Sequence, residues 1–89
     1  GRESRYTISD MYNICSDRLL TDEDIKHFTK KELRIVRNQI YAKHGYIFKS
    51  KDLQEYFSQF DWYSPTSRDV ARQLTKTETA NVSFIKARE

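Results

Sequence analysis

The segment of residues 30–44 constrains the fold most, because it carries both a helix start and a helix stop. Thr29 and Glu32 have the spacing of a capping box, in which two side chains satisfy free backbone N–H groups of the first turn. Gly45 follows, and glycine readily adopts the left-handed conformation that often ends a helix. One stripe of this helix, about 80° wide, holds Leu33, Val36, Ile40 and His44. The segment is therefore predicted to be a helix with one buried face.

Similar signals predict three more helices, at residues 22–28, 51–58 and 76–88. Thr21 precedes a run of acidic residues, Ser50 precedes Asp52, and Thr75 begins a second capping box. No strand pattern, internal repeat or low-complexity tract interrupts these segments. The sequence thus predicts an all-α fold, a small bundle of about four short helices.

Residues 1–18 give a weaker signal than the rest of the chain. Tyr6, Ile8, Tyr12 and Ile14 alternate loosely with polar residues, which suits an extended arm at least as well as a fifth helix. We expect residues 1–18 to form an N-terminal arm packed on a helical domain of residues 19–89. A chain of 89 residues has room for one core, and a third of its apolar residues are aromatic, so rings must build much of that core.

The composition argues against a disulfide, a membrane span, a metal site and a catalytic cysteine. Cys15 is the only cysteine, so no internal disulfide forms. No apolar run approaches the ~18 residues of a membrane span, and no signal peptide opens the chain. Because the chain starts at Gly1 without a methionine, we interpret it as a piece of a longer protein. His27 and His44 have no matching pair of cysteines, so we predict no metal site and no cofactor. A Cys15/His44 catalytic pair is the weakest option, because the two residues lie in different elements.

The charge is distributed unevenly along the chain. Residues 26–51 hold eight basic side chains against one acid, a net +7, which leaves −4 for the remainder of a chain whose total is +3. Acids before and after this segment can pair with it in a compact fold. The alternative is a patch for an anionic polymer or a membrane surface. Nucleic acid is disfavoured, because the basic residues of 30–44 scatter around the helix.

Two polar groups lie on the apolar stripe and need partners, since burying an unpaired charge is costly. We expect Arg37 to pair with an acid from residues 51–58 or from the loop after them. His44 is expected to be oriented by Asp61 or Glu55, or else to bind a ligand. The residues expected to hold the structure are Arg37, Asn38, Gly45 and Asn81; both asparagines are expected to tie a helix to a loop backbone.

Eight of the twelve aromatic residues lie between Tyr41 and Tyr63. Phe48, Phe57 and Phe60 are expected in the core, because their rings carry no polar group. Tyrosine and tryptophan rings favour a half-buried rim, where they stack well on sugars and peptide groups. A shallow aromatic and basic groove is therefore the binding hypothesis, and its candidate residues are Tyr41, Lys43, His44, Tyr46, Trp62 and Tyr63.

The order of these motifs resembles the YARHG domain of exported bacterial proteins. The resemblance covers roughly residues 19 to 88. It rests on Arg37-Asn38, Ile40 to Tyr46, Phe48, Leu53, Tyr56-Phe57, Trp62 to Pro65, Glu78, Asn81 and Ile85. Residues 41–45 read Tyr-Ala-Lys-His-Gly, so Lys43 replaces the arginine of the motif and loses its planar fork.

The resemblance implies a location outside the cytoplasm, in the cell envelope or beyond it, and attaches no reaction to the domain. Three function classes stay open: a non-catalytic binding module, a small hydrolytic or peptidase-associated domain that uses His44, and a structural spacer or cap. The expected partner is a cell-wall or envelope component or a neighbouring protein domain, and we expect the isolated domain to be a monomer.

Overall fold

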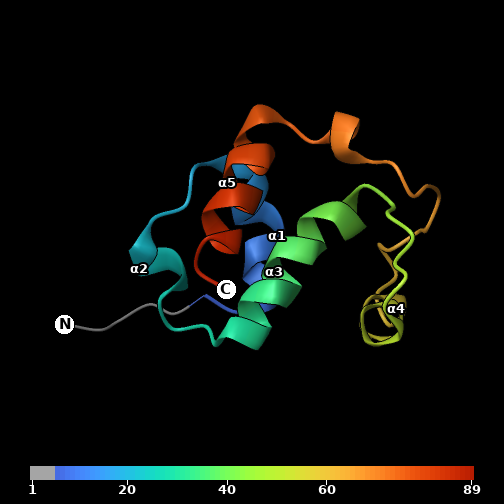
Figure 1. Cartoon of the computed structure of the whole chain (residues 1–89), viewed down its shortest axis with the longest axis horizontal. Helices are drawn as coiled ribbons and strands as arrows, with labels where there is room; N and C mark the ends of the chain where they lie inside the picture. The colour runs from blue at the N-terminus through green and yellow to red at the C-terminus, as the bar shows by residue number, and fades with distance from the viewer. Residues whose placement is uncertain (1–5) are drawn as a thin grey trace.

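A computed structural model describes residues 6–89, and these residues form a small all-α bundle, as expected (Figure 1). Its elements are α1 (Ile8–Asp17), α2 (Asp22–Ile25), α3 (Lys30–Lys43), α4 (Lys51–Ser58), the 3₁₀ turn η1 (Ala71–Gln73) and α5 (Lys76–Lys86). Across the described chain the pairing of extended backbone is limited to one isolated parallel bridge between Tyr46 and Ser67. None of the described helices is long and apolar enough to span a bilayer.

The N-terminal segment corrects one expectation, because residues 8–17 form helix α1 and not an extended arm. Thr7 and Asp10 make a capping box at its start, and Met11 and Cys15 are buried four residues apart on its inner face. The loose alternation of apolar residues concealed this helical spacing. Residues 1–5, which the expected arm included, lie outside the described part of the chain.

The other helices begin where their caps predict. Both predicted capping boxes are formed, at Thr29 and at Thr75. Helix α2 is shorter than the predicted 22–28, because its backbone turns after Ile25 so that Thr29 can start α3. The boundaries of α4 agree with the prediction, and α5 ends two residues earlier.

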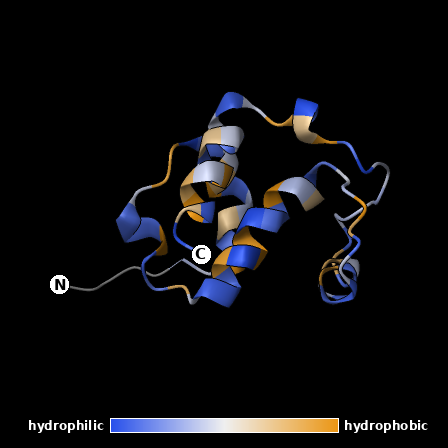
Figure 2. Ribbon diagram, in the orientation of Figure 1, coloured by the Kyte–Doolittle hydropathy of each residue, from blue (hydrophilic) through white to orange (hydrophobic). Residues whose placement is uncertain are grey.

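Helix α3 is the central element, with α1 and α5 packed against it, while α4 lies to one side (Figure 1). Apolar segments of α1, α3 and α5 face one another in the middle of the bundle (Figure 2). This first core is largely aliphatic; its buried residues are Met11, Cys15, Leu20, Ile25, Leu33, Val36, Ile40, Val82 and Ile85. Burial of such side chains contributes roughly 1.5–3 kcal/mol each.

A second, aromatic core joins α4 to the end of α3, so the buried residues form two clusters and not the one core expected. Its buried members are Ala42, Phe48, Leu53 and Phe57, and the rings of Phe48 and Phe57 stack 5.1 Å apart. Phe48 and Phe57 are thus in the core as predicted, whereas Phe60 is only half-buried. Tyr41 packs against both cores.

A buried amide connects α5 to the segment between α1 and α2. The Asn81 side chain donates hydrogen bonds to the carbonyls of Cys15 and Arg18, at 2.8 and 2.9 Å, and accepts one from the Leu20 N–H at 2.9 Å. This geometry confirms the predicted role of Asn81, which ties a helix to a loop backbone.

An ion pair secures the start of α2. The Arg18 guanidinium donates two hydrogen bonds to the buried Asp24 carboxylate, and these bonds lower the pKa of Asp24 from its ordinary 3.8 to about 2. A lowered carboxyl pKa stabilises the fold above the unfolded-state pKa, and the contribution is lost as the pH falls through the folded-state pKa.

We therefore expect acid to weaken the native protein more than an Asp24→Asn variant. Between pH 4 and pH 2 the native protein should lose about 1–2 kcal/mol more, a figure reduced because Arg18 is partly exposed. Urea denaturation at several pH values measures this difference. Asp17→Asn, at an exposed carboxylate of α1, is the control; an equal pH response in both variants would contradict the assignment.

Candidate functional site

The end of α3 is shaped by Gly45, which has a φ of 86°. The N–H groups of Gly45 and Tyr46 donate to the carbonyls of Ala42 and Tyr41, the paired bonds of a Schellman motif. The Gly45 carbonyl in turn accepts a hydrogen bond from the Thr66 N–H at 2.7 Å. The turn after α3 therefore holds the loop that leads to η1.

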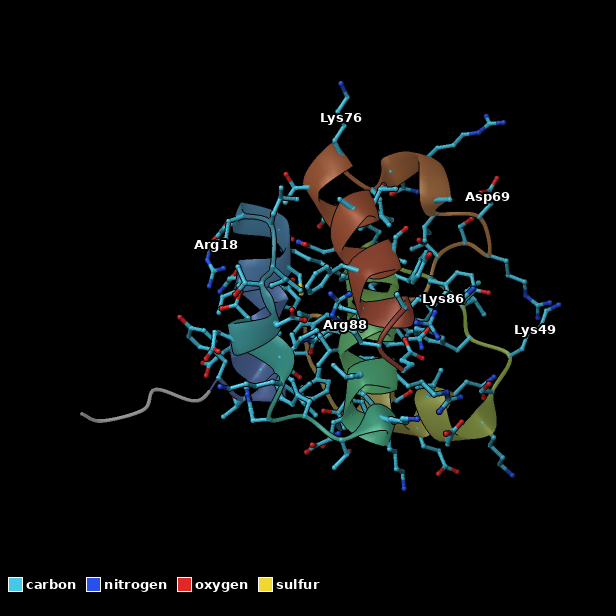
Figure 3. The ribbon with its side chains drawn as sticks, turned by 60° about the vertical axis from the view of Figure 1, so that its left-hand side comes forward. Arg18, Lys49, Asp69, Lys76, Lys86 and Arg88 are labelled. Atoms are coloured by element: carbon cyan, nitrogen blue, oxygen red, sulfur yellow. The ribbon has the colours of Figure 1, made fainter. Side chains whose placement is uncertain are left out.

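An open pocket of about 330 Å³ lies between α3 and this loop. Helix α3 and its terminal turn supply Arg37, Asn38, Tyr41 and Tyr46. The opposite wall is formed by Arg68, Asp69, Val70 and Ala71. Asp69 lines this wall and is exposed, so its carboxylate lies at the rim. Figure 3 shows its side chain on the loop, directed to solvent. The pocket brings together four residues of the motif.

Arg37 is positioned by an acid that the sequence did not suggest. Its guanidinium donates through Nε and Nη2 to both carboxylate oxygens of Glu89. The expected acid from residues 51–58 or the loop after them is wrong. Because Glu89 follows α5, the ion pair connects the end of α5 to α3, and its arginine lines the pocket.

Asn38 does not make the predicted bond to a loop. Its Nδ2 donates to the Arg34 carbonyl, one turn earlier in α3, at 2.8 Å. This bond uses one of the two N–H donors of the amide and holds the side chain along the helix, at the wall of the pocket.

His44 lies away from the pocket, in a network under α5. Its Nε2 is 2.9 Å from Oε1 of Glu78, and the side chains are 21% and 2% exposed respectively. The expected partners Asp61 and Glu55 are wrong. Glu78 also accepts hydrogen bonds from the Ser16 hydroxyl, at 2.6 Å, and from the Thr75 N–H, at 2.9 Å. His44 is therefore held by hydrogen-bonding contacts within the folded domain.

The hydrogen bonds around the Glu78 carboxyl favour its ionised form. Burial raises its pKa, but the hydrogen bonds from Ser16, from the Thr75 backbone and from His44 outweigh burial, and the pKa is lowered from its ordinary value.

Lys43 lies on the other side of this hydrogen-bond network. Its Nζ donates to the Ser16 hydroxyl at 2.8 Å and lies 4.4 Å from the centre of the Tyr12 ring.

The predicted groove is divided among three environments. Tyr41 and Tyr46 line the pocket, whereas Lys43 and His44 belong to the Glu78 network. Trp62 packs between Phe60 and Tyr12, with ring centres at 5.3 and 4.7 Å. The Tyr63 hydroxyl donates a hydrogen bond to the Tyr46 carbonyl at 2.6 Å and thereby holds the backbone of a pocket residue.

The residues that sequence reasoning missed all come from distant segments. Arg68, Asp69 and Glu89 reach the pocket region through folding, and no local pattern marks them. Ser16 was missed because its helix was interpreted as an arm. Glu78 was visible as part of the resemblance and of a capping box, but not as the partner of His44.

The cysteine has no feature of a nucleophile. Cys15 is buried in the first core, and burial raises the pKa of its thiol to about 12. Among the described residues, no group of three His, Cys, Asp or Glu side chains is arranged to hold a metal ion.

Fold and pocket together define a small all-α domain built around one central helix, with an open polar and aromatic pocket at the end of that helix. The chain belongs to the YARHG family, since the YARHG domain matches residues 5–89. No curated protein shows significant similarity to it. A solved structure from Legionella pneumophila, described as a putative nutrient binding protein, is 32% identical, with a TM-score of 0.63. The similarity covers 90% of this chain and 22% of that protein.

Proposed function

We propose that this domain is a non-catalytic binding module of an exported bacterial envelope protein, and that its ligand occupies the pocket beside Tyr41 and Tyr46. Four residues of the family motif line one open pocket, and this observation carries the proposal. They are Arg37, Asn38, Tyr41 and Tyr46. Pockets of this size with convergent polar groups are common sites for small ligands. The family is typical of exported proteins, and the description of the Legionella relative as nutrient binding agrees with a binding role.

The other two function classes have less support. A hydrolytic domain would use His44, which bonds to Glu78 and does not line the pocket. A pure spacer would turn its motif residues inward, but Tyr41 and Tyr46 keep part of their surface at an open pocket. A binding role accounts for these polar and aromatic groups better than either alternative.

The proposal is tested by NMR titration of the ¹⁵N-labelled domain with solubilised peptidoglycan fragments. We expect amide shifts at the pocket residues of α3 and of the loop before η1. The His44 amide should shift no more than the α3 amides outside the pocket. Ala71→Trp should fill the pocket from its exposed wall and abolish the shifts, because it adds bulk without removing a described contact.

Ala80→Trp is the matched control, since Ala80 is exposed on α5 outside the pocket. Binding retained in Ala80→Trp and lost in Ala71→Trp would support the proposal. Fragments that bind Ala71→Trp as well as the native protein, or pocket amides that shift with neither the fragments nor a free dipeptide, would overturn it.

A further inference from the structure

We propose that the pocket binds a small zwitterion, an amino acid or the end of a short peptide, with its carboxylate at Arg37 and Arg68 and its ammonium at Asp69. This inference rests on the proposed function and adds the chemical class of the ligand. It begins from the hydrogen-bonding groups that the folded chain leaves unused around one cavity.

Arg37 retains donors after its ion pair is made. A guanidinium has five N–H groups in a planar fork, and Glu89 takes one at Nε and one at Nη2. Within residues 6–89, Nη1 has no hydrogen-bond acceptor. Glu89 therefore fixes the plane of the guanidinium while the other edge remains able to receive a second carboxylate.

Arg68 adds a positive charge to the opposite wall. It is exposed, and the described part of the chain offers it no ion-pair partner. The charge of Arg37 is balanced by Glu89, so Arg68 is the cation that favours an anionic group over a neutral one. Two guanidinium groups on facing walls suit a planar carboxylate bound between them.

Asp69 adds a negative charge to the same wall as Arg68. Its backbone N–H bonds to Ser67, but in the described chain its carboxylate accepts no hydrogen bond. The carboxylate at the rim repels a ligand that is only anionic and attracts an ammonium group a short distance from the bound carboxylate. With Arg37 paired to Glu89, and Arg68 beside Asp69, the pocket is close to neutral overall and matches a ligand of no net charge.

The size and the aromatic wall agree with this ligand class. A volume of about 330 Å³ is near the lower limit of small-molecule pockets, so it admits one or two residues of a peptide. Between the charged ends, Tyr41 and Tyr46 offer ring faces, with ring centres 5.9 Å apart, for the apolar part of the ligand. In the described structure neither tyrosine hydroxyl takes part in an internal hydrogen bond.

The test is calorimetric and NMR titration of the full chain with the dipeptide alanyl-alanine, its C-terminal amide, its N-acetyl derivative and inorganic phosphate. We expect the free dipeptide to bind and to shift the pocket amides. Amidation should weaken binding at least about tenfold, the effect of losing one charged hydrogen-bond pair. N-acetylation should weaken it less, and phosphate should bind more weakly than the dipeptide.

Two exposed side chains give variants that leave the fold intact. Arg68→Gln should weaken dipeptide binding about tenfold, whereas Arg72→Gln, the same change at an exposed arginine outside the pocket, should not. Asp69→Asn should weaken binding of the free dipeptide and leave that of the N-acetyl derivative unchanged, with Asp61→Asn as the control.

The outcomes separate this inference from the proposed function. If the amide binds as tightly as the acid, or if phosphate binds more tightly than either, the zwitterion is wrong. If peptidoglycan fragments bind in a manner that Ala71→Trp blocks while the dipeptide does not bind, the inference fails and the binding module stands. If the dipeptide binds, and if amidation of the fragments abolishes fragment binding, the ligand is the end of a peptide chain. If the dipeptide binds and the fragments do not, the ligand is a free molecule.

Discussion

Replacing Gly45 by alanine is expected to lower the free energy of unfolding by about 2–4 kcal/mol. The backbone has a φ of 86°, where a Cβ atom is unfavourable by about 1–2 kcal/mol. A Cβ would also lie 2.5 Å from Oγ1 of Thr66 and 2.8 Å from the Ser64 carbonyl oxygen. Because the second neighbour is backbone, the loop before η1 has to move away from α3.

Urea denaturation of the native and variant proteins measures this loss. The double variant Gly45→Ala/Thr66→Ala removes the Oγ1 contact, together with the long 3.4 Å hydrogen bond from this hydroxyl to the Gly45 carbonyl, and should recover part of the stability. The unfavourable φ and the Ser64 contact persist in it. The pocket amides should also shift in Gly45→Ala, because Tyr46 and the facing loop share this turn. A loss below about 1 kcal/mol would contradict the strained position.

Asn81→Ala is expected to be at least as damaging, with a loss of about 3–5 kcal/mol. The substitution leaves the carbonyls of Cys15 and Arg18 and the N–H of Leu20 without their partner in a buried region. Each buried polar group that loses its hydrogen bond costs about 1–3 kcal/mol, less where water can enter. The connection between α5 and the α1–α2 segment would open.

Thermal and urea unfolding give the measurement, and Asn13→Ala is the matched control. Asn13 is exposed on α1, so its replacement should change stability by no more than about 0.5 kcal/mol. Equal effects of the two substitutions would show that the buried hydrogen bonds of Asn81 are not what stabilises this junction.

The helices could be predicted because their signals are local. These signals are the capping boxes at Thr29 and Thr75 and the glycine at position 45. Each depends only on residues close to it in the chain, and the structure forms all three as expected. Helix α1 was missed for the opposite reason. Its apolar and polar residues alternate loosely, as in a strand, and its buried face, with Met11 and Cys15, is defined only by packing against α3 and α5.

The partners of the polar residues could not be predicted in the same way. Arg37 and His44 needed acids, but Glu89 and Glu78 lie 52 and 34 residues away along the chain. The nearer acids expected for His44, Asp61 and Glu55, are both exposed. Sequence reasoning identified which side chains need a partner, and the path of the loop through η1 back to α5 decides which partner they meet.

The two separate cores give this domain two units of different resistance to opening. The aliphatic core is held by three helices, whereas α4 and its rings are attached mainly through the end of α3. Amide protons of α4 should therefore exchange with solvent through a partial opening that leaves α1, α3 and α5 folded. Because Tyr41 packs on both cores and also lines the pocket, a bound ligand would raise the free energy of that opening and slow exchange in a helix that it does not touch.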